Sequence, residues 1–252
     1  MIKKNKIDKE IQETESKKTY LELNNLLNRP VDGKIQVEKD KEAVKQYFLE
    51  EIIPSTITFY TLKDKLDFLV ENNYYEKEFL DKYPFEFIKK LYQKIYNHEF
   101  RFNSFMGAKK FYLQYALKDN DTGKYLETYE DRLAVNALFL ANGDQELAMN
   151  LAEDLINHRY QPATPTFLNA GKANRGEFTS CFLLNVTDSM LSIGRSFNSV
   201  VQLSKNGGGV GLLLSNLRES GSPIKGIKNA ASGVVPVMKI YEDQFSYANQ
   251  LG

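Results

Sequence analysis

A single cysteine, Cys181, occurs in this chain of 252 residues, at the start of the apolar run Cys-Phe-Leu-Leu-Asn-Val. Buried cysteines behave as small hydrophobic groups, whereas a reactive thiolate needs an exposed and polar setting. Thr179 and Ser180 before it are polar, and the turn-rich segment upstream can bring backbone donors near the thiol. No second cysteine and no candidate His/Asp partner lies near Cys181 in the sequence, which disfavours a Cys/His hydrolase. A redox role would need a partner thiol from outside this chain, and simple packing is the alternative.

The densest glycine cluster, Gly207–Gly209 followed by Gly211, lies between two apolar segments. Glycine-rich loops often hold phosphate through backbone N–H groups, but a P-loop requires a following Gly-Lys-Ser/Thr, which this cluster lacks. The cluster also precedes a predicted strand, whereas a dinucleotide-binding fingerprint opens a helix. A tight turn and a ligand-binding loop therefore both stay open.

Charged and polar residues flank this cluster on both sides. Arg218 and Lys225 lie seven positions apart around the turn Glu-Ser-Gly-Ser-Pro, and two cations on one loop can hold a phosphate group. Asp188 and Ser189 come directly before a helical pattern, where an N-cap is the simplest role. The alternative for Asp188 is to accept a hydrogen bond from a ribose hydroxyl.

Composition disfavours several classes of protein. The 33 basic and 33 acidic residues cancel, which removes the electrostatic argument for nucleic acid or an anionic membrane surface as a partner. No apolar run approaches the roughly 20 residues that cross a bilayer, and Met1–Lys18 lacks the apolar centre of a secretory signal. We therefore expect a cytoplasmic protein. His98 and His158 lie outside any Cys/His cluster, so no metal site is expected.

The chain up to about residue 160 predicts helices. Its apolar residues recur at helical spacing in three stripes: Leu62, Leu66, Leu69 and Val70; Phe79, Tyr83, Phe87 and Leu91; Leu147, Leu151 and Leu155. Pro84 should break or kink the second stripe. Thr128 with Asp131 resembles a capping box, Gly143 should end that helix, and Asp144 should cap the next one.

After residue 160, Gly, Ser, Thr and Asn become frequent, and short apolar runs lie between turn residues. The runs Cys-Phe-Leu-Leu-Asn-Val, Gly-Val-Gly-Leu-Leu-Leu and Gly-Val-Val-Pro-Val-Met-Lys-Ile indicate strands. Between the first two runs, helical spacing is shown by Ile193, Phe197, Val200 and Val201. This order of strand, helix and strand predicts a βαβ unit in an α/β fold.

Residues 161–194, 202–227 and 231–252 resemble, almost word for word, the large (alpha, R1) subunit of class Ib ribonucleotide reductases, and the match is continuous from about residue 20. The resemblance implies a helical N-terminal region followed by the first part of a ten-stranded α/β barrel. The implied organisation is a charged, disordered N-terminus at 1–19, a helical N-terminal domain at 20–100, a helical region leading into the barrel at 101–170, and the incomplete barrel at 171–252.

The same resemblance implies roles for individual residues. Cys181 would be one of two barrel cysteines that reduce the ribose 2′ carbon and close into a disulfide, with its partner outside this chain. The positions that hold the ribonucleoside diphosphate in the family are matched by Thr164, Ser180, Cys181 and Gly209. The positions of an allosteric site for ATP or a deoxynucleoside triphosphate are matched by Asp188, Ser189, Met190, Arg218 and Lys225.

The implied function is reduction of ribonucleoside diphosphates to 2′-deoxyribonucleoside diphosphates by thiyl-radical chemistry, which supplies DNA synthesis. The implied partners are a second large subunit, a small (beta, R2) subunit whose dimetal centre supplies the radical, and a glutaredoxin-like reductant. The family's other catalytic residues would lie beyond Gly252, so we expect a fragment that is inactive alone. The chain before residue 20 is too short for the ATP-binding cone of other classes, so we expect no activity switch of that kind.

Two alternatives from other classes of protein stay open. One is a catalytically inactive module that uses only the nucleotide-binding and dimerisation surfaces. The other is an α/β domain in which the cysteine is structural.

Overall fold

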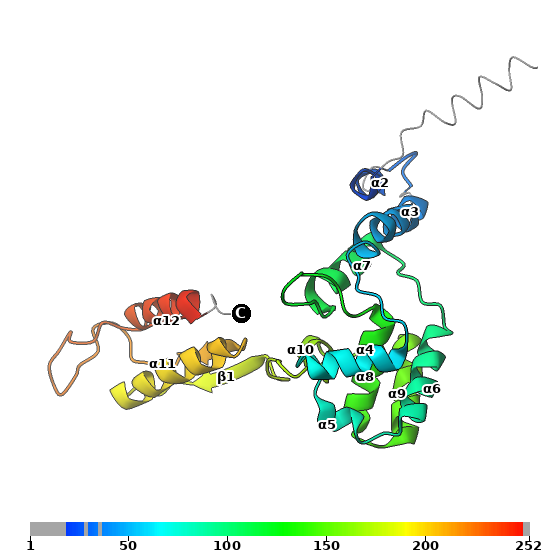
Figure 1. The fold of residues 1–252 in the computed structure, drawn as a ribbon. Helices are drawn as coiled ribbons and strands as arrows, with labels where there is room; N and C mark the ends of the chain where they lie inside the picture. The colour runs from blue at the N-terminus through cyan, green and yellow to red at the C-terminus, as the bar shows by residue number, and fades with distance from the viewer. Residues whose placement is uncertain (1–18, 28–29, 35–36, 249–252) are drawn as a thin grey trace, which may run out of the picture. The chain divides into compact units, whose positions relative to one another are not determined.

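The computed structural model describes residues 19–27, 30–34 and 37–248. The chain divides into two compact units, unit 1 over Met1–Gln161 and unit 2 over Pro162–Gly252. Unit 1 is helical, and unit 2 combines helices with a two-stranded sheet in its described part (Figure 1). The predicted change of structure near residue 160 is therefore confirmed. The disorder predicted for residues 1–19 falls, except for Thr19, outside the described residues.

The elements of unit 1 follow one another with short connections. Its α-helices are α2 (Tyr20–Leu27), α3 (Val37–Tyr47), α4 (Leu62–Glu71), α5 (Lys77–Leu80), α6 (Phe85–Tyr96), α7 (Phe105–Lys110), α8 (Tyr129–Ala141) and α9 (Gln145–Ile156). Two π-helical turns, η1 (Phe48–Ile52) and η2 (Phe111–Tyr115), continue α3 and α7.

Local capping chemistry sets the ends of these helices. Thr128 and Asp131 form the predicted capping box at the start of α8, and the Asp144 side chain accepts a hydrogen bond from the Leu147 N–H at the start of α9. Between them, Asn142 adopts the left-handed conformation that ends α8, and Gly143 follows with φ +103°. Pro84 separates α5 from α6, as its missing N–H predicts.

The core of unit 1 gathers around α8, which is buried on most of its surface, with α6 and α9 beside it. Leu66, Leu69 and Leu91 are buried as their spacing predicts. The stripe predicted for α9 is partly wrong, because Leu147 is 44% exposed. The buried face of α9 consists instead of Ala148, Ala152, Leu155 and Ile156, since small residues let this helix pack closely against α8.

A buried ionic cluster lies within this core. The Glu127 carboxylate pairs with Arg132 at 3.2 Å, and both side chains are fully buried. Glu127 also accepts hydrogen bonds from the Tyr75 hydroxyl at 2.5 Å and the Leu117 N–H at 2.9 Å. Burial and the nearby Glu127 charge raise the pKa of Tyr75 well above its ordinary value. The cluster therefore ties the segment before α5 and the loop before α8 to α8 itself.

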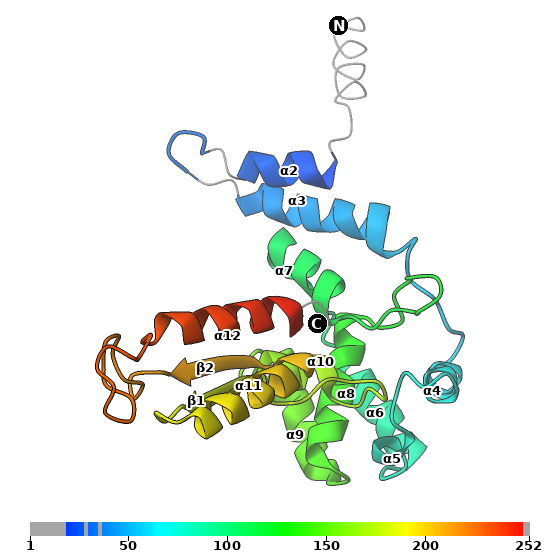
Figure 2. The same cartoon turned by 90° about the vertical axis from the view of Figure 1, so that its left-hand side faces the viewer.

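Unit 2 contains the predicted βαβ unit. After the short helix α10 (Thr164–Asn169), β1 (Cys181–Asn185) leads through α11 (Met190–Lys205) into β2 (Gly209–Leu213). The two strands are parallel and in register from Cys181 opposite Gly209 to Asn185 opposite Leu213. Figure 2 shows them side by side. The start of an α/β barrel domain is thus present, and the sheet is not closed.

The third strand predicted for this unit is wrong, because residues 235–248 form the helix α12 (Val235–Ala248). Pro236 is tolerated there because the first turn of a helix needs no N–H from it. Tyr241 of α12 packs its ring against Phe197 at 4.7 Å and shares a hydrogen bond with Ser196 of α11. No helix among the described residues is long and apolar enough to cross a membrane.

Candidate functional site

The first group of candidate residues meets where β1 and β2 begin. Cys181 is the first residue of β1, and it is exposed and forms no disulfide. Its sulfur lies 3.8 Å from the Ser180 hydroxyl, and Gly209 is its partner in the sheet. Parallel pairing in register therefore places three of the four predicted substrate residues together. The fourth, Thr164, is exposed and comes from the first turn of α10.

Among the described residues of unit 2, the side chains on the Cys181 face of the sheet are exposed. Exposure alternates along both strands, and Leu183, two positions after Cys181, is 90% exposed. The intervening residues Phe182 and Val210 point to the other face, where α11 packs. The Cys181 thiol therefore lies on the exposed face of this two-stranded sheet.

The glycine cluster forms the turn between α11 and β2. Its three N–H groups all donate to backbone carbonyls: Gly207 to Ser204, Gly208 to Leu203, and Gly209 to Ser180 at 2.7 Å. Gly207 has φ +81°, as a helix-ending glycine does. A Cβ on Gly208 would lie 2.8 Å from the Leu203 carbonyl oxygen and 2.6 Å from the Phe182 ring. The turn interpretation is therefore supported, and these N–H groups already have acceptors.

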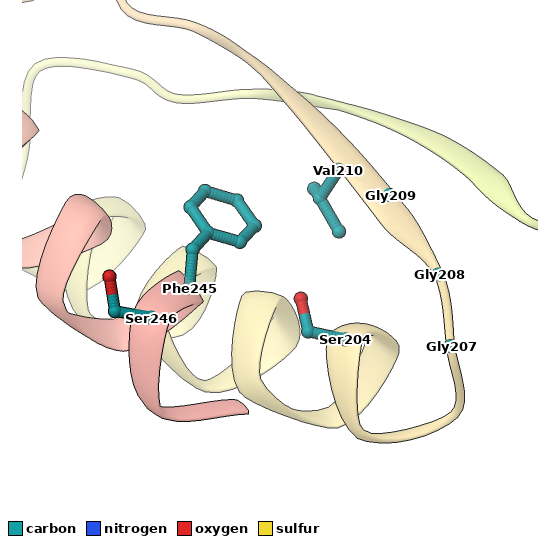
Figure 3. Close-up of a pocket in the computed structure, with 7 residues that line it drawn as sticks. All are labelled: Ser204, Gly207, Gly208, Gly209, Val210, Phe245 and Ser246. Atoms are coloured by element: carbon teal, nitrogen blue, oxygen red, sulfur yellow. The ribbon is translucent and has the colours of Figure 1, made fainter. Parts of the chain in front are cut away.

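A hollow of about 480 Å³ lies beside this turn, lined by Ser204, Gly207, Gly208, Gly209, Val210, Phe245 and Ser246 (Figure 3). The Ser204 hydroxyl, on the last turn of α11, is buried and has no hydrogen-bond partner in the described part of the chain. Phe245 of α12 supplies an aromatic wall opposite the strand. The hollow thus adjoins Gly209, and its lining combines two serines and glycine backbone with the apolar side chains of Val210 and Phe245.

The second group of candidates lies beyond the carboxyl ends of the two strands. Ser189 is the N-cap of α11, and its hydroxyl accepts a hydrogen bond from the Ser192 N–H, as predicted. Asp188 does not cap the helix. Its carboxylate instead accepts a hydrogen bond from Arg218 Nε at 2.7 Å. Met190 follows the cap and is 82% exposed.

The segment after β2 presents the two predicted cations. Arg218 Nη1 donates to the Pro223 carbonyl at 3.1 Å, which fixes the guanidinium against the loop. Ile224 and Ile227 exchange backbone hydrogen bonds, so Lys225 and Gly226 occupy the centre of a tight turn. Lys225 has φ +50°, a conformation that costs energy for a residue with a side chain.

Sequence reasoning missed a further hollow, which lies in unit 1. It has a volume of about 810 Å³, and its walls include the rings of Phe48, Phe100 and Tyr112, with Lys41 and Arg101 also on its lining. Phe48 of η1 meets Tyr112 of η2 edge to face at 5.4 Å. Because this hollow is lined by segments far apart in the chain, no local sequence pattern predicts it.

The described residues contain no group of three His, Cys, Asp or Glu side chains arranged to hold a metal ion. At the second site, Arg218 and Lys225 can bind an anionic group, and Asp188 can accept a hydrogen bond from a hydroxyl group of the same ligand. The exposed thiol of the first suits a redox step.

Three family models match consecutive parts of the chain. They are the ribonucleotide reductase N-terminal model at residues 20–100, the all-alpha domain at 101–175 and the barrel domain at 179–252. The chain therefore belongs to the ribonucleotide reductase large-subunit family, and it corresponds to the N-terminal region of that subunit.

Individual relatives agree with this placement. The chain is 54% identical over 233 residues to the ribonucleoside-diphosphate reductase subunit alpha of Bacillus subtilis (strain 168), a match that covers 92% of this chain and 33% of the relative. It is 50% identical over 238 residues to the protein of the same name from Mycoplasma pneumoniae, covering 94% and 32%. For the Mycoplasma genitalium protein the identity is 53% over 213 residues, covering 84% and 30%. The chain thus spans about a third of the length of these relatives.

Proposed function

We propose that this chain is the N-terminal part of a class Ib ribonucleoside-diphosphate reductase alpha subunit. The proposed activity reduces ribonucleoside diphosphates to 2′-deoxyribonucleoside diphosphates in the cytoplasm. The observation that carries the proposal is the exposed Cys181 beside Gly209 on the exposed face of the barrel strands, within a chain that is 54% identical to a reductase alpha subunit.

In the proposed reaction, Cys181 acts together with a second thiol from outside this chain. The ribose 2′-hydroxyl leaves as water and a hydrogen takes its place. The two thiols supply two electrons and two protons and are joined as a disulfide, so the reaction balances. A glutaredoxin-like reductant then restores the thiols. Thr164, Ser180 and the Gly209 turn would line the substrate. The Gly209 N–H would not contact it, because this group already donates a hydrogen bond to the Ser180 carbonyl.

The second site would bind the allosteric effector, ATP or a deoxynucleoside triphosphate. Arg218 and Lys225 supply charge for the triphosphate, because guanidinium and ammonium groups form short charge-assisted hydrogen bonds with phosphate oxygens. Asp188 would accept a hydrogen bond from a sugar hydroxyl, and Ser189 and Met190 begin the helix beside it. A second large subunit would complete this site. A small subunit with a dimetal centre would supply the radical.

A chimeric subunit tests the catalytic part of this proposal. In it, the chain replaces the matching 233 residues of the Bacillus subtilis relative. We expect the chimera, with small subunit and dithiothreitol, to form dCDP from CDP over many turnovers. Its Cys181→Ser variant should keep its fold and its effector binding but lose turnover, because a hydroxyl cannot enter the two-electron thiol couple. Turnover by that variant at the unsubstituted rate would mean that Cys181 only packs.

One observation favours a second candidate, an inactive nucleotide-binding and dimerisation module. Asp188 and Arg218, two of the proposed effector residues, meet in an ion pair beside the start of α11, so the nucleotide-binding part of the proposal does not depend on Cys181. Such a module predicts dTTP binding by the chain together with a chimera that forms no dCDP, although its thermal stability matches that of the relative. Dimerisation on adding dTTP, measured by light scattering, would accompany either function and does not by itself favour one of them.

A further inference from the structure

Asp188 and Arg218, which are proposed to bind the sugar and the phosphates of the effector, form an ion pair with one another in this structure. Asp188 Oδ2 lies 2.7 Å from Arg218 Nε, and Asp188 Oδ1 lies 3.4 Å from the Arg218 backbone nitrogen. Both side chains are more than a third exposed. The guanidinium is also held from the other side by the Pro223 carbonyl. The cation that should meet a triphosphate is therefore already neutralised by a carboxylate.

A triphosphate and this carboxylate compete for one guanidinium, because both are acceptors for the same N–H groups. An anion that binds Arg218 must displace the Asp188 carboxylate. The displaced carboxylate then lies close to the anion without a partner, and the two negative charges repel. Asp188 therefore lowers the affinity for any polyanion that has no hydroxyl group to donate to the released carboxylate.

We propose that Asp188 guards Arg218 by pairing with its guanidinium, and that the effector binds by exchange of these partners. The triphosphate takes the Arg218 guanidinium, and the freed Asp188 accepts a hydrogen bond from the sugar hydroxyl of the same ligand. This proposal rests on the proposed effector site and assigns Asp188 a second task there. Asp188 thereby selects nucleoside triphosphates against inorganic polyphosphates, which bring phosphate but no sugar hydroxyl.

Lys225 is the cation available for first contact. Among the described residues its ammonium group forms no ion pair, and it lies at the tip of the Ile224–Ile227 turn. A phosphate can bind there before the Asp188–Arg218 pair opens. The exchange can therefore begin at Lys225, while Arg218 is still paired with Asp188.

The test measures binding of two probes, dTTP and inorganic tripolyphosphate, to the chimeric subunit described above and its variants. Calorimetry is done at one fixed ionic strength, because salt screens exposed charges. In Asp188→Asn, tripolyphosphate should bind about two- to fivefold more tightly, which corresponds to roughly 0.4 to 1 kcal/mol. The preference for dTTP over tripolyphosphate should shrink, because the amide is a weaker acceptor than the carboxylate. The control is Glu219→Gln, which removes the adjacent negative charge outside this pair. It should change the affinity for both probes by the same small factor.

The outcomes separate this inference from the proposed function. Equal effects of Asp188→Asn and Glu219→Gln on tripolyphosphate, or weaker tripolyphosphate binding by Asp188→Asn, would overturn the guarding role while leaving the effector site intact. Absence of dTTP binding by the chimeric subunit, or unchanged dTTP affinity in its Arg218→Ala and Lys225→Ala variants, would overturn the effector site itself. Tighter tripolyphosphate binding together with a reduced preference for dTTP supports the exchange.

Discussion

Removal of the buried Glu127 carboxylate should be among the most damaging single changes in unit 1. Arg132 would keep its charge in a site with no exposure, and breaking a buried ion pair in this way costs about 3 to 5 kcal/mol. The Tyr75 hydroxyl and the Leu117 N–H would also lose their acceptor, at roughly 1 kcal/mol or more each. We therefore expect Glu127→Ala to cost about 5 to 7 kcal/mol, close to the whole stability of many domains.

Urea unfolding followed by tyrosine fluorescence measures this effect. The chain contains no tryptophan, and most of its 15 tyrosines lie before residue 161, so the signal reports mainly on unit 1. Glu127→Gln should cost less than Glu127→Ala, because its amide oxygen still accepts one hydrogen bond. The double variant Glu127→Leu with Arg132→Met should recover most of the loss, because well-packed apolar residues replace buried ion pairs at little cost.

An exposed ion pair provides the control. Lys94 lies 2.7 Å from Glu153, with side chains 39% and 44% exposed, so Lys94→Ala should cost less than about 1 kcal/mol. Equal losses in Glu127→Ala and Lys94→Ala would refute the reasoning from burial. A double variant as unstable as Glu127→Ala alone would show that packing, and not the stranded charge, sets the cost.

Four further substitutions test local features. Gly208→Ala should destabilise unit 2 by about 1 to 3 kcal/mol in thermal unfolding, because the new methyl group would clash with the Leu203 carbonyl oxygen. Gly194→Ala is the control: its methyl group meets nothing within 4 Å, so it should stabilise α11 by up to about 1 kcal/mol. Lys225→Gly should leave the melting temperature unchanged or higher, since glycine accepts φ +50° at little cost, while dTTP affinity falls; a parallel loss of both would indicate a structural lysine. Thr128→Ala should cost about 1 kcal/mol through loss of the capping box, measured by urea unfolding, and no change would contradict that role.

Features set by neighbouring residues could be predicted from the sequence. The Thr128–Asp131 box, the Asp144 cap and the break at Pro84 each depend on chemistry within a few positions, and all three are confirmed. The parallel βαβ unit was also accessible, because two short apolar runs flank an amphipathic stretch. The resemblance to ribonucleotide reductases, borne out by the family models, supplied what local patterns could not.

The errors arose where one local pattern admits two structures. The run after Gly233 is rich in valine, which favours strands, but its apolar residues continue as the helix α12. Leu147 was placed in the core by its spacing, yet the packing of α9 uses the alanine face instead. The Glu127–Arg132 cluster was missed because Tyr75, which completes it, lies 52 residues before Glu127. The Asp188–Arg218 pair, 30 residues apart, was likewise invisible to local patterns.

The parallel register also determines how the two proposed sites relate within unit 2. Cys181 and Gly209 are paired at the amino ends of β1 and β2, whereas Asp188 and Arg218 follow the carboxyl ends of the same strands. Each strand has five residues, so the two ends are about 13 Å apart at roughly 3.3 Å per residue. A ligand that separates Asp188 from Arg218 acts on the segments that leave both strands at once. The proposed effector residues and the proposed redox cysteine therefore lie at opposite ends of the same two short strands, which α11 joins.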